Sequence, residues 1–249
     1  MSVKRWLRSR VEQAFDVHVL PVGHVARVFE WEHLRHFFEH FEVDCVFDVG
    51  ANAGQYATML RQHVGYRGNI VSYEPIPEHA ARLSAAAAGD SSWFVEELAL
   101  SATPGRASFN IFASDQFSSL HALSDAAIAQ FHQAVDLARR IEVRTALLLD
   151  EIPKYAARLG FKRPFLKMDT QGHDLSVALG AGERLRDFVG LQSELSIEPL
   201  YAGVPRYHDA LEFYRERGFE LSALVPNNLG HFPRLLEIDC IMYRVTATH

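Results

Sequence analysis

The chain has 249 residues, of which 48% are hydrophobic and 22% are charged. Such a chain forms one α/β domain with a full core, or two small domains at most, and is neither disordered, collagen-like nor a coiled coil. Its 25 lysines and arginines against 31 aspartates and glutamates give a net charge of −6, so no global basic field is present to hold a nucleic acid. Cys45 and Cys240 both lie in apolar runs, which predicts buried free thiols in a reducing compartment.

The N-terminus is basic but does not have the pattern of a signal peptide. Lys4, Arg5, Arg8 and Arg10 are followed by polar residues instead of a continuous apolar segment. No charge-free apolar stretch of about 18 residues occurs elsewhere, so no transmembrane helix is expected and the protein is predicted to be cytoplasmic. The basic start could make a peripheral membrane contact, dock a neighbouring subunit or form a solvated helix face. The oligomeric state stays open.

Residues 1–41 are predicted to form an N-terminal helical segment, because apolar residues recur there at spacings of three and four. They are Val25, Val28, Phe29, Leu34, Phe37, Phe38 and Phe41. His36 and His40 have a spacing that can bind zinc, but no cysteine or second histidine pair occurs at a spacing that would supply the remaining ligands. We therefore predict no metal site.

Residues 42–249 are predicted to form a Rossmann-like domain with a doubly wound, mostly parallel sheet, because short β-branched or aromatic runs alternate with helical stretches. The strands are expected at 45–49, 69–73, 93–97, 165–168, 189–194, 219–225 and 238–245, and the helices near 55–64, 78–88, 174–179 and 208–217. The loop between the last two strands is too short for a crossover helix, so one of them should run antiparallel.

An insertion around 105–145 interrupts this rhythm. Residues 107–113 and 142–149 are predicted to be extra strands, with a helix over 125–139 between them. Elements that cover a substrate are often built at such a place. The serine-rich residues 114–121 either line an acceptor pocket or form an ordinary polar loop.

The most informative stretch, 46–56, is an apolar strand followed by a glycine-containing turn and a helix. Gly50 and Gly54 let the backbone approach a ligand closely, and the helix N-terminus offers free amides. The dinucleotide fingerprint requires glycine where this chain has Gly50, Asn52 and Gln55, so the pattern fails twice. Asp48 lies at the carboxyl end of the strand, where open α/β sheets bind ligands.

A carboxylate just before this turn suits a cationic ligand that carries an amine better than it suits a pyrophosphate. S-adenosylmethionine is such a ligand, since it has an ammonium, a sulfonium and a ribose but no phosphate. The second strand ends at Tyr73-Glu74-Pro75, and an acid about 20 residues beyond the turn can accept both ribose hydroxyls. The alternative is that Asp48 and Glu74 are merely polar strand ends.

Six segments occur in order along the chain: 47–54 (FDVGANAG), 73–75 (YEP), 99–101 (ALS), 149–151 (LDE), 166–172 (LKMDTQG) and 195–203 (LSIEPLYAG). In this set, over roughly residues 44–245, the chain resembles the FkbM-type family of S-adenosylmethionine-dependent methyltransferases. The resemblance implies a seven-stranded Rossmann-like sheet and methyl transfer to a hydroxyl of a sugar, glycolipid, polysaccharide or secondary-metabolite acceptor. It also implies cofactor contacts from Asp48, Gly50, Asn52, Gly54, Gln55, Glu74, Pro75, Ala99 and Asp169. The family commonly has Glu where this chain has Gln171.

Transfer to a hydroxyl needs a base, which contributes about 10²–10⁴-fold. Asp169 ends a buried strand at the same crevice as Asp48 and Glu74, and a lone buried carboxylate is costly unless it is used. We expect Asp169 to orient the acceptor or take its proton; the alternatives are that it caps the following helix or pairs with Lys167.

His173 and Glu194 are the other candidate catalytic residues. The intrinsic pKa of histidine suits a base at neutral pH, and an acid in a central strand is expensive unless it lies at the crevice edge. The segment 169–172 lacks the Pro-Pro-aromatic turn typical of nucleobase amine methyltransferases. The rival functions are a nicotinamide-dependent oxidoreductase and a non-catalytic binding domain that keeps the cofactor fold.

Overall fold

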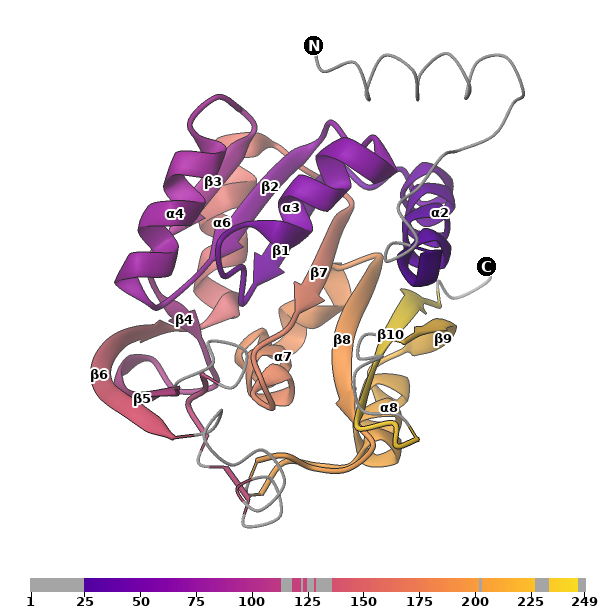
Figure 1. Cartoon of the computed structure of the whole chain (residues 1–249). Helices are drawn as coiled ribbons and strands as arrows, with labels where there is room; N and C mark the ends of the chain where they lie inside the picture. Colours follow the sequence, from indigo (N-terminus) through magenta and orange to yellow (C-terminus); the bar gives the residue numbers. More distant parts are fainter. Residues whose placement is uncertain are drawn as a thin grey trace, which may run out of the picture.

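The computed structural model describes residues 25–112, 118–121, 123–124, 128, 136–201, 203–226 and 233–245. Within them a seven-stranded sheet has the order β3-β2-β1-β7-β8-β10-β9 (Figure 1). Strand β10 runs antiparallel to both β8 and β9, and the other neighbours are parallel. The predicted Rossmann-like sheet with one antiparallel strand is therefore confirmed. The strands are β1 (Cys45–Val49), β2 (Asn69–Tyr73), β3 (Trp93–Glu96), β7 (Pro164–Met168), β8 (Gly190–Ser196), β9 (Phe219–Val225) and β10 (Glu237–Arg244).

Helices cover both faces of the sheet, because alternate residues of each central strand point to opposite sides. Val46 of β1 belongs to a buried cluster with Leu34 and Leu83, whereas Phe47 belongs to the opposite cluster with Tyr155 and Val177. The first face carries α2 (Val25–His40), α3 (Gln55–Met59), its π-helical continuation (Leu60–Val64) and α4 (Pro77–Ala87). The second face carries α6 (Leu148–Leu159), α7 (Asp174–Gly180), a 3₁₀ helix (Gly182–Asp187) and α8 (Tyr207–Glu216).

Helix α2 is the part of the predicted N-terminal helical segment that lies within the described residues; residues 1–24 lie outside them. Its inner side buries Phe37 and Phe38, whose rings meet Phe165 of β7 edge-on at centroid distances of 5.4 and 5.0 Å. Phe29 is 54% exposed and does not belong to the buried stripe. The division into 1–41 and 42–249 stays a prediction.

The insertion supplies β5 and most of β6 to a second, three-stranded sheet with the order β4-β6-β5, and β4 precedes the insertion. The strands of this sheet are β4 (Ala99–Leu100), β5 (Gly105–Phe112) and β6 (Leu137–Ala146). The helix predicted over 125–139 is wrong at 137–139, because those residues pair antiparallel with β5; residues 113–117, 125–127 and 129–135 lie outside the described part of the chain. The strand predicted over 142–149 ends three residues early, because Leu148 and the buried Ile152 and Tyr155 begin the apolar face of α6.

Cys45 and Cys240 are buried and free, as the sequence predicts. Burial raises the pKa of both thiols above the ordinary value, so neither is a reactive thiolate at neutral pH. Among the residue ranges given above, no helix combines the length and apolarity needed to span a membrane.

The turn after β1 requires glycine at Gly50, where φ is +77° and an added Cβ would lie 1.9 Å from the carbonyl oxygen of Asp169. The added Cβ would also lie 2.8 Å from the carbonyl carbon of Asp169. Because both of these atoms belong to the backbone, neither can move away cheaply, and we expect Gly50→Ala to lower the free energy of unfolding by about 3 kcal/mol or more. Urea titration measures this. Gly89→Ala is the matched control, since a Cβ there meets nothing within 4 Å; a Gly50→Ala variant as stable as Gly89→Ala would contradict the argument.

Candidate functional site

A cavity of about 640 Å³ opens at the carboxyl ends of the central strands and is closed on one side by the insertion through Phe109 and Leu120. This volume is in the range of small-molecule and cofactor sites. Of the residues selected from the sequence, the cavity is lined by Gly50, Asn52, Gln55, Glu74, Pro75, Ala99, Asp169, His173 and Glu194. Asp48 and Gly54 are not among the lining residues.

Gly54 supports the turn from behind. Its φ is +87°, and an added Cβ would lie 2.9 Å from the ring of Trp93 on β3 and 3.0 Å from Leu83 of α4. The absence of a side chain therefore lets the start of α3 pack closely against β3 and α4. Its place in the motif is explained by packing.

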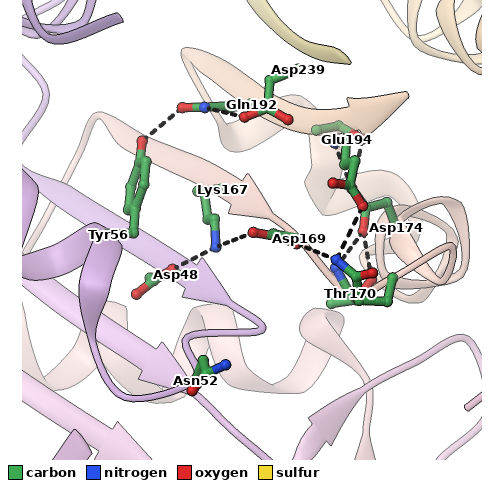
Figure 2. A network of polar contacts seen from close by, with 12 residues as sticks. Asp48, Asn52, Tyr56, Lys167, Asp169, Thr170, Asp174, Gln192, Glu194 and Asp239 are labelled. Carbon is green, nitrogen blue, oxygen red and sulfur yellow. Dashed lines mark hydrogen bonds and ion pairs between the residues drawn. The ribbon is translucent and has the colours of Figure 1, made fainter. Parts of the chain in front are cut away.

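Asp48 is completely buried under the cavity. It accepts a hydrogen bond of 3.1 Å from the hydroxyl of Ser72, and its Oδ1 lies 3.3 Å from the Nζ of Lys167 (Figure 2). A buried carboxylate needs such a partner, because an unpaired charge in the interior costs several kcal/mol. Asp48 thus does not line the cavity itself but contacts Lys167, which does.

Lys167 also lines the cavity, and the sequence indicated it only as a possible partner of Asp169. Its Nζ also lies 3.6 Å from Oδ2 of Asp169 and 5.2 Å from the ring centroid of Tyr56. Burial opposes the charge of Lys167, but the carboxylates of Asp48 and Asp169 outweigh it and raise the pKa above its ordinary value. The pairing of Asp169 with Lys167 is therefore present in the structure, and through Lys167 it connects the buried Asp48 to a residue that lines the cavity.

Glu74 lines the cavity at the end of β2 and is only 4% exposed. Its two carboxylate oxygens accept the backbone N–H groups of Asn52 at 2.8 Å and Ile76 at 2.9 Å. Asn52 has a left-handed backbone, with φ of +48°. Burial raises the pKa of Glu74 to about 7, against the opposing effect of these two hydrogen bonds. Each oxygen keeps an acceptor position, since a carboxylate oxygen has two lone-pair sites.

Asp169 ends β7 with its side chain 46% exposed to the cavity. The alternative that it caps the following helix is wrong, because Asp174 is the residue that makes the local contacts. Oδ1 of Asp174 accepts the N–H of Thr170 at 2.9 Å, and its Oδ2 accepts the hydroxyl of Ser193 and the N–H of Glu194, both at 2.9 Å. Asp174 thereby ties the turn after β7 to β8 (Figure 2).

Gln171, which sequence reasoning treated only as a departure from the family pattern, bridges two candidate catalytic residues. Its Nε2 donates to Oδ1 of Asp169 at 3.1 Å and to Oε2 of Glu194 at 3.3 Å. The hydroxyl of Tyr201 donates to its Oε1 at 2.8 Å, and the hydroxyl of Ser119 donates to its backbone carbonyl at 2.7 Å. Its φ is +53°, a conformation that costs a residue with a side chain about 1–2 kcal/mol.

His173 lines the cavity, but both ring nitrogens have partners. Nδ1 lies 2.9 Å from Nε2 of His121, and Nε2 lies 3.1 Å from the hydroxyl of Ser101. Burial, with a further contribution from His121, lowers the pKa of His173 to about 4. The ring is therefore neutral at pH 7 and a weak base.

A second amide bridge lies farther along the same wall, at residues that sequence reasoning missed. The Nε2 of Gln192 donates to Oε1 of Glu30 at 2.9 Å. It also donates to Oδ2 of Asp239 at 3.0 Å, and the hydroxyl of Tyr56 donates to Oε1 of Gln192 at 2.9 Å (Figure 2). The sequence contained one signal for this wall: Glu237 and Asp239 are two residues apart at the start of a predicted strand, which places both side chains on the same face.

This wall of the cavity is acidic. Glu30, Glu194, Glu237 and Asp239 line it together with Asp169. Burial is the main cause that raises their pKa values: for Glu237 to about 7, and for Glu30, Glu194 and Asp239 above the ordinary value, with neighbouring carboxylates adding to the effect. Among the described residues no group of three or more His, Cys, Asp or Glu side chains is arranged to hold a metal ion.

The sheet and its carboxyl-end cavity define a Rossmann-like domain with an acid at the end of β2 and another at the end of β7. The methyltransferase FkbM domain model matches residues 48–221. The chain therefore belongs to the FkbM family of S-adenosylmethionine-dependent methyltransferases, and S-adenosylmethionine is its cofactor. This assignment disfavours the oxidoreductase alternative.

Solved structures with a related fold are distant in sequence. Magnesium protoporphyrin IX methyltransferase from Synechocystis PCC 6803, solved with bound S-adenosylmethionine, is 7% identical over 98% of each chain with a TM-score of 0.45. An rRNA methylase from Streptococcus thermophilus is 11% identical over 86% of this chain and 95% of that one, with a TM-score of 0.44. Aeropyrum pernix fibrillarin is 13% identical over 80% of this chain and 66% of that one, with a TM-score of 0.41. No curated protein sequence matches the chain.

Removing the buried ammonium should leave Asp48 uncompensated. We expect Lys167→Met to lower the free energy of unfolding by about 3–5 kcal/mol, the cost of breaking a buried ion pair by removing one partner. The double variant Asp48→Asn, Lys167→Met should regain more than half of that loss, since no buried charge is left without its partner. Urea unfolding of the three proteins measures the effect. Equal losses in the single and double variants would show that the lysine stabilises by packing alone.

Proposed function

We propose that the protein transfers the methyl group of S-adenosylmethionine to a hydroxyl of a polyhydroxylated acceptor such as a sugar, neutral or carrying an amine. The observation that carries this proposal is the half-exposed carboxylate of Asp169, which lies in the cavity next to an acidic wall. When bound, S-adenosylmethionine supplies a methyl group activated by a sulfonium. Everything else in the reaction depends on how the residues of this chain bind, orient and deprotonate the acceptor.

The residues present fit this cofactor. Glu74 keeps one acceptor position on each carboxylate oxygen, which suits the two hydroxyls of a ribose. Gly50, Asn52, Gln55, Pro75 and Ala99 line the same part of the cavity and would complete the cofactor site. We assign Asp48 and Gly54 to the same site as supports, Asp48 through Lys167 and Gly54 through the packing of α3.

Asp169 is the best base among the three candidates. The ammonium of Lys167, 3.6 Å from Oδ2, attracts a carboxylate at this position. His173 is a weak base with both nitrogens engaged, and the raised pKa of Glu194 favours its neutral form. In this proposal the carboxylate of Asp169 accepts the proton of the acceptor hydroxyl and holds its oxygen in line for transfer.

The acidic wall favours one class of acceptor. The carboxyl groups of Glu30, Glu237 and Asp239 accept hydrogen bonds from hydroxyls in either protonation state. Where such a group is ionised, it attracts an ammonium and repels a phosphate. A sugar, glycolipid headgroup, polysaccharide or secondary metabolite with several hydroxyls meets this requirement. A nucleic acid does not, in agreement with the net charge of −6.

Methyl transfer from radiolabelled S-adenosylmethionine to four acceptor classes tests the proposal: neutral glycosides, amino-sugar glycosides, sugar phosphates and an RNA oligonucleotide. Label should appear on the neutral or amine-bearing glycosides. With the best acceptor, Asp169→Asn should lower kcat by about 10²-fold or more, because the amide keeps the size but removes the basicity. The affinity for S-adenosylhomocysteine should change little.

Asp136→Asn is the control, since Asp136 is exposed and does not line the cavity. Label on RNA, or an Asp169→Asn variant that is as active as Asp136→Asn, would refute the corresponding part of the proposal. Binding of the cofactor with no label on any class would favour the non-catalytic alternative.

Cofactor affinity should depend on pH through Glu74. Its pKa of about 7 means that the acid binds a proton below neutral pH, and a protonated oxygen loses an acceptor position for the ribose. The dissociation constant for S-adenosylhomocysteine should therefore rise by up to about 100-fold between pH 8 and pH 5, since the binding of one proton allows at most a tenfold change for each pH unit below the pKa. Calorimetry over this range measures it. Glu74→Gln should bind weakly at every pH; a Glu74→Gln variant with the same pH slope would assign the titration to another group.

A further inference from the structure

The turn that follows β7 holds Asp169 by both of its carboxylate oxygens. Oδ1 accepts the amide N–H of Gln171 at 3.1 Å, and Oδ2 faces the ammonium of Lys167 at 3.6 Å. With one partner on each oxygen, the plane of the carboxylate is fixed, and each oxygen keeps a lone pair for a third group. Lys167 is itself held from below by Asp48.

The amide of Gln171 is fixed in turn by its own contacts. Its Oε1 accepts the hydroxyl of Tyr201 at 2.8 Å, so the Nε2 must face the other way, toward Asp169 and Glu194. Tyr201 is buried, and its ring lies against Gly172, where an added Cβ would be 3.0 Å away. The hydroxyl of Ser119 holds the backbone of Gln171 from the insertion.

A side-chain amide satisfies this set of contacts without a shared proton. Two neighbouring acids require a donor, and the hydroxyl of Tyr201 requires an acceptor. A lysine or arginine would donate to the acids but could not accept from Tyr201. A glutamate would accept from Tyr201 but would place a third carboxyl group against Asp169 and Glu194, which is unfavourable unless a proton is shared among them.

We propose that Gln171 is a positioning residue for methyl transfer: its amide, oriented by Tyr201, holds the carboxylate of Asp169 at the angle at which that carboxylate meets the acceptor hydroxyl. The inference rests on the proposed function, because it assigns Gln171 to the action of Asp169 as the base. Gln171 also donates to Glu194, so one amide nitrogen links the two acids.

The decisive variant is Gln171→Glu, which keeps the size of the side chain and replaces the donor by an acceptor. We expect kcat to fall by about tenfold or more, because small misplacements of a reacting group are costly. The acidic limb of the pH profile of kcat should move to higher pH, since the change adds a carboxyl to a region already faced by several ionisable groups. These are Lys167 from β7, Asp174 from α7, Glu194 from β8, and Glu237 and Asp239 from β10.

Tyr201→Phe should shift kcat and the pH profile in the same direction by a smaller amount, because it frees the orientation of the amide and leaves the donor in place. Gln62→Glu adds the same group on the exposed side of the π-helical turn and should change neither quantity. All variants should keep the affinity for S-adenosylhomocysteine within about threefold, since Glu74 and the β1 turn are untouched.

A readout independent of turnover separates this inference from the proposed function. In crystal structures with S-adenosylhomocysteine, the carboxylate of Asp169 should keep its position in wild type and in Gln62→Glu and turn away from residue 171 in Gln171→Glu. An unmoved Asp169 carboxylate together with an unchanged kcat and pH profile would overturn the inference. A wild-type protein that transfers no methyl group to any hydroxyl would refute the proposed function, and the crystal structures would still decide whether Gln171 positions Asp169.

Discussion

The buried ion pair between Lys167 and Asp48 is the interaction on which the centre of the site depends. The two residues lie on adjacent strands, in register across β7 and β1, and neither charge could stay in the interior without the other. Because the same ammonium also faces Asp169, one cation compensates both the buried carboxylate of Asp48 and the carboxylate of Asp169 in the cavity. The parallel pairing of β1 and β7 therefore places the positive charge of Lys167 next to the carboxylate of Asp48 without help from any loop.

Beyond Lys167, the acidic wall is stabilised by two uncharged glutamine amides that make the same set of contacts. Gln171 and Gln192 each donate from one amide nitrogen to two acids and accept a tyrosine hydroxyl at the amide oxygen. An amide donates to these acids and adds no charge to the wall, whereas a lysine or arginine would add a positive charge. The wall can thus remain rich in hydrogen-bond acceptors while its buried polar groups are paired, which suits the proposed acceptor with several hydroxyls.

Sequence patterns predicted the parts of the molecule that depend on neighbours along the chain. The strand periodicity, the glycine turn after β1 and the acids that end β2 and β7 were all readable, because each is a local signal. The partners in the cavity were not. Gln192 and Asp239 meet because β8 and β10 are neighbours in the sheet, and Glu30 reaches them from helix α2. The strand at 137–139 was missed for the same reason, since pairing with β5 overrides its helical pattern.

The turn that lines the cofactor side and the residue proposed as the base form one backbone unit. The N–H of Gly50 donates to the carbonyl of Tyr73, the N–H of Asp169 donates to the carbonyl of Val49, and the missing side chain of Gly50 lets the Asp169 carbonyl lie against the turn. A shift of either turn would therefore displace the other. Methyl transfer requires donor carbon and acceptor oxygen to be aligned closely, and under the proposed function that alignment depends on the hydrogen-bonded centre of the sheet. The insertion closes the cavity from one side and lies outside this hydrogen-bonded centre.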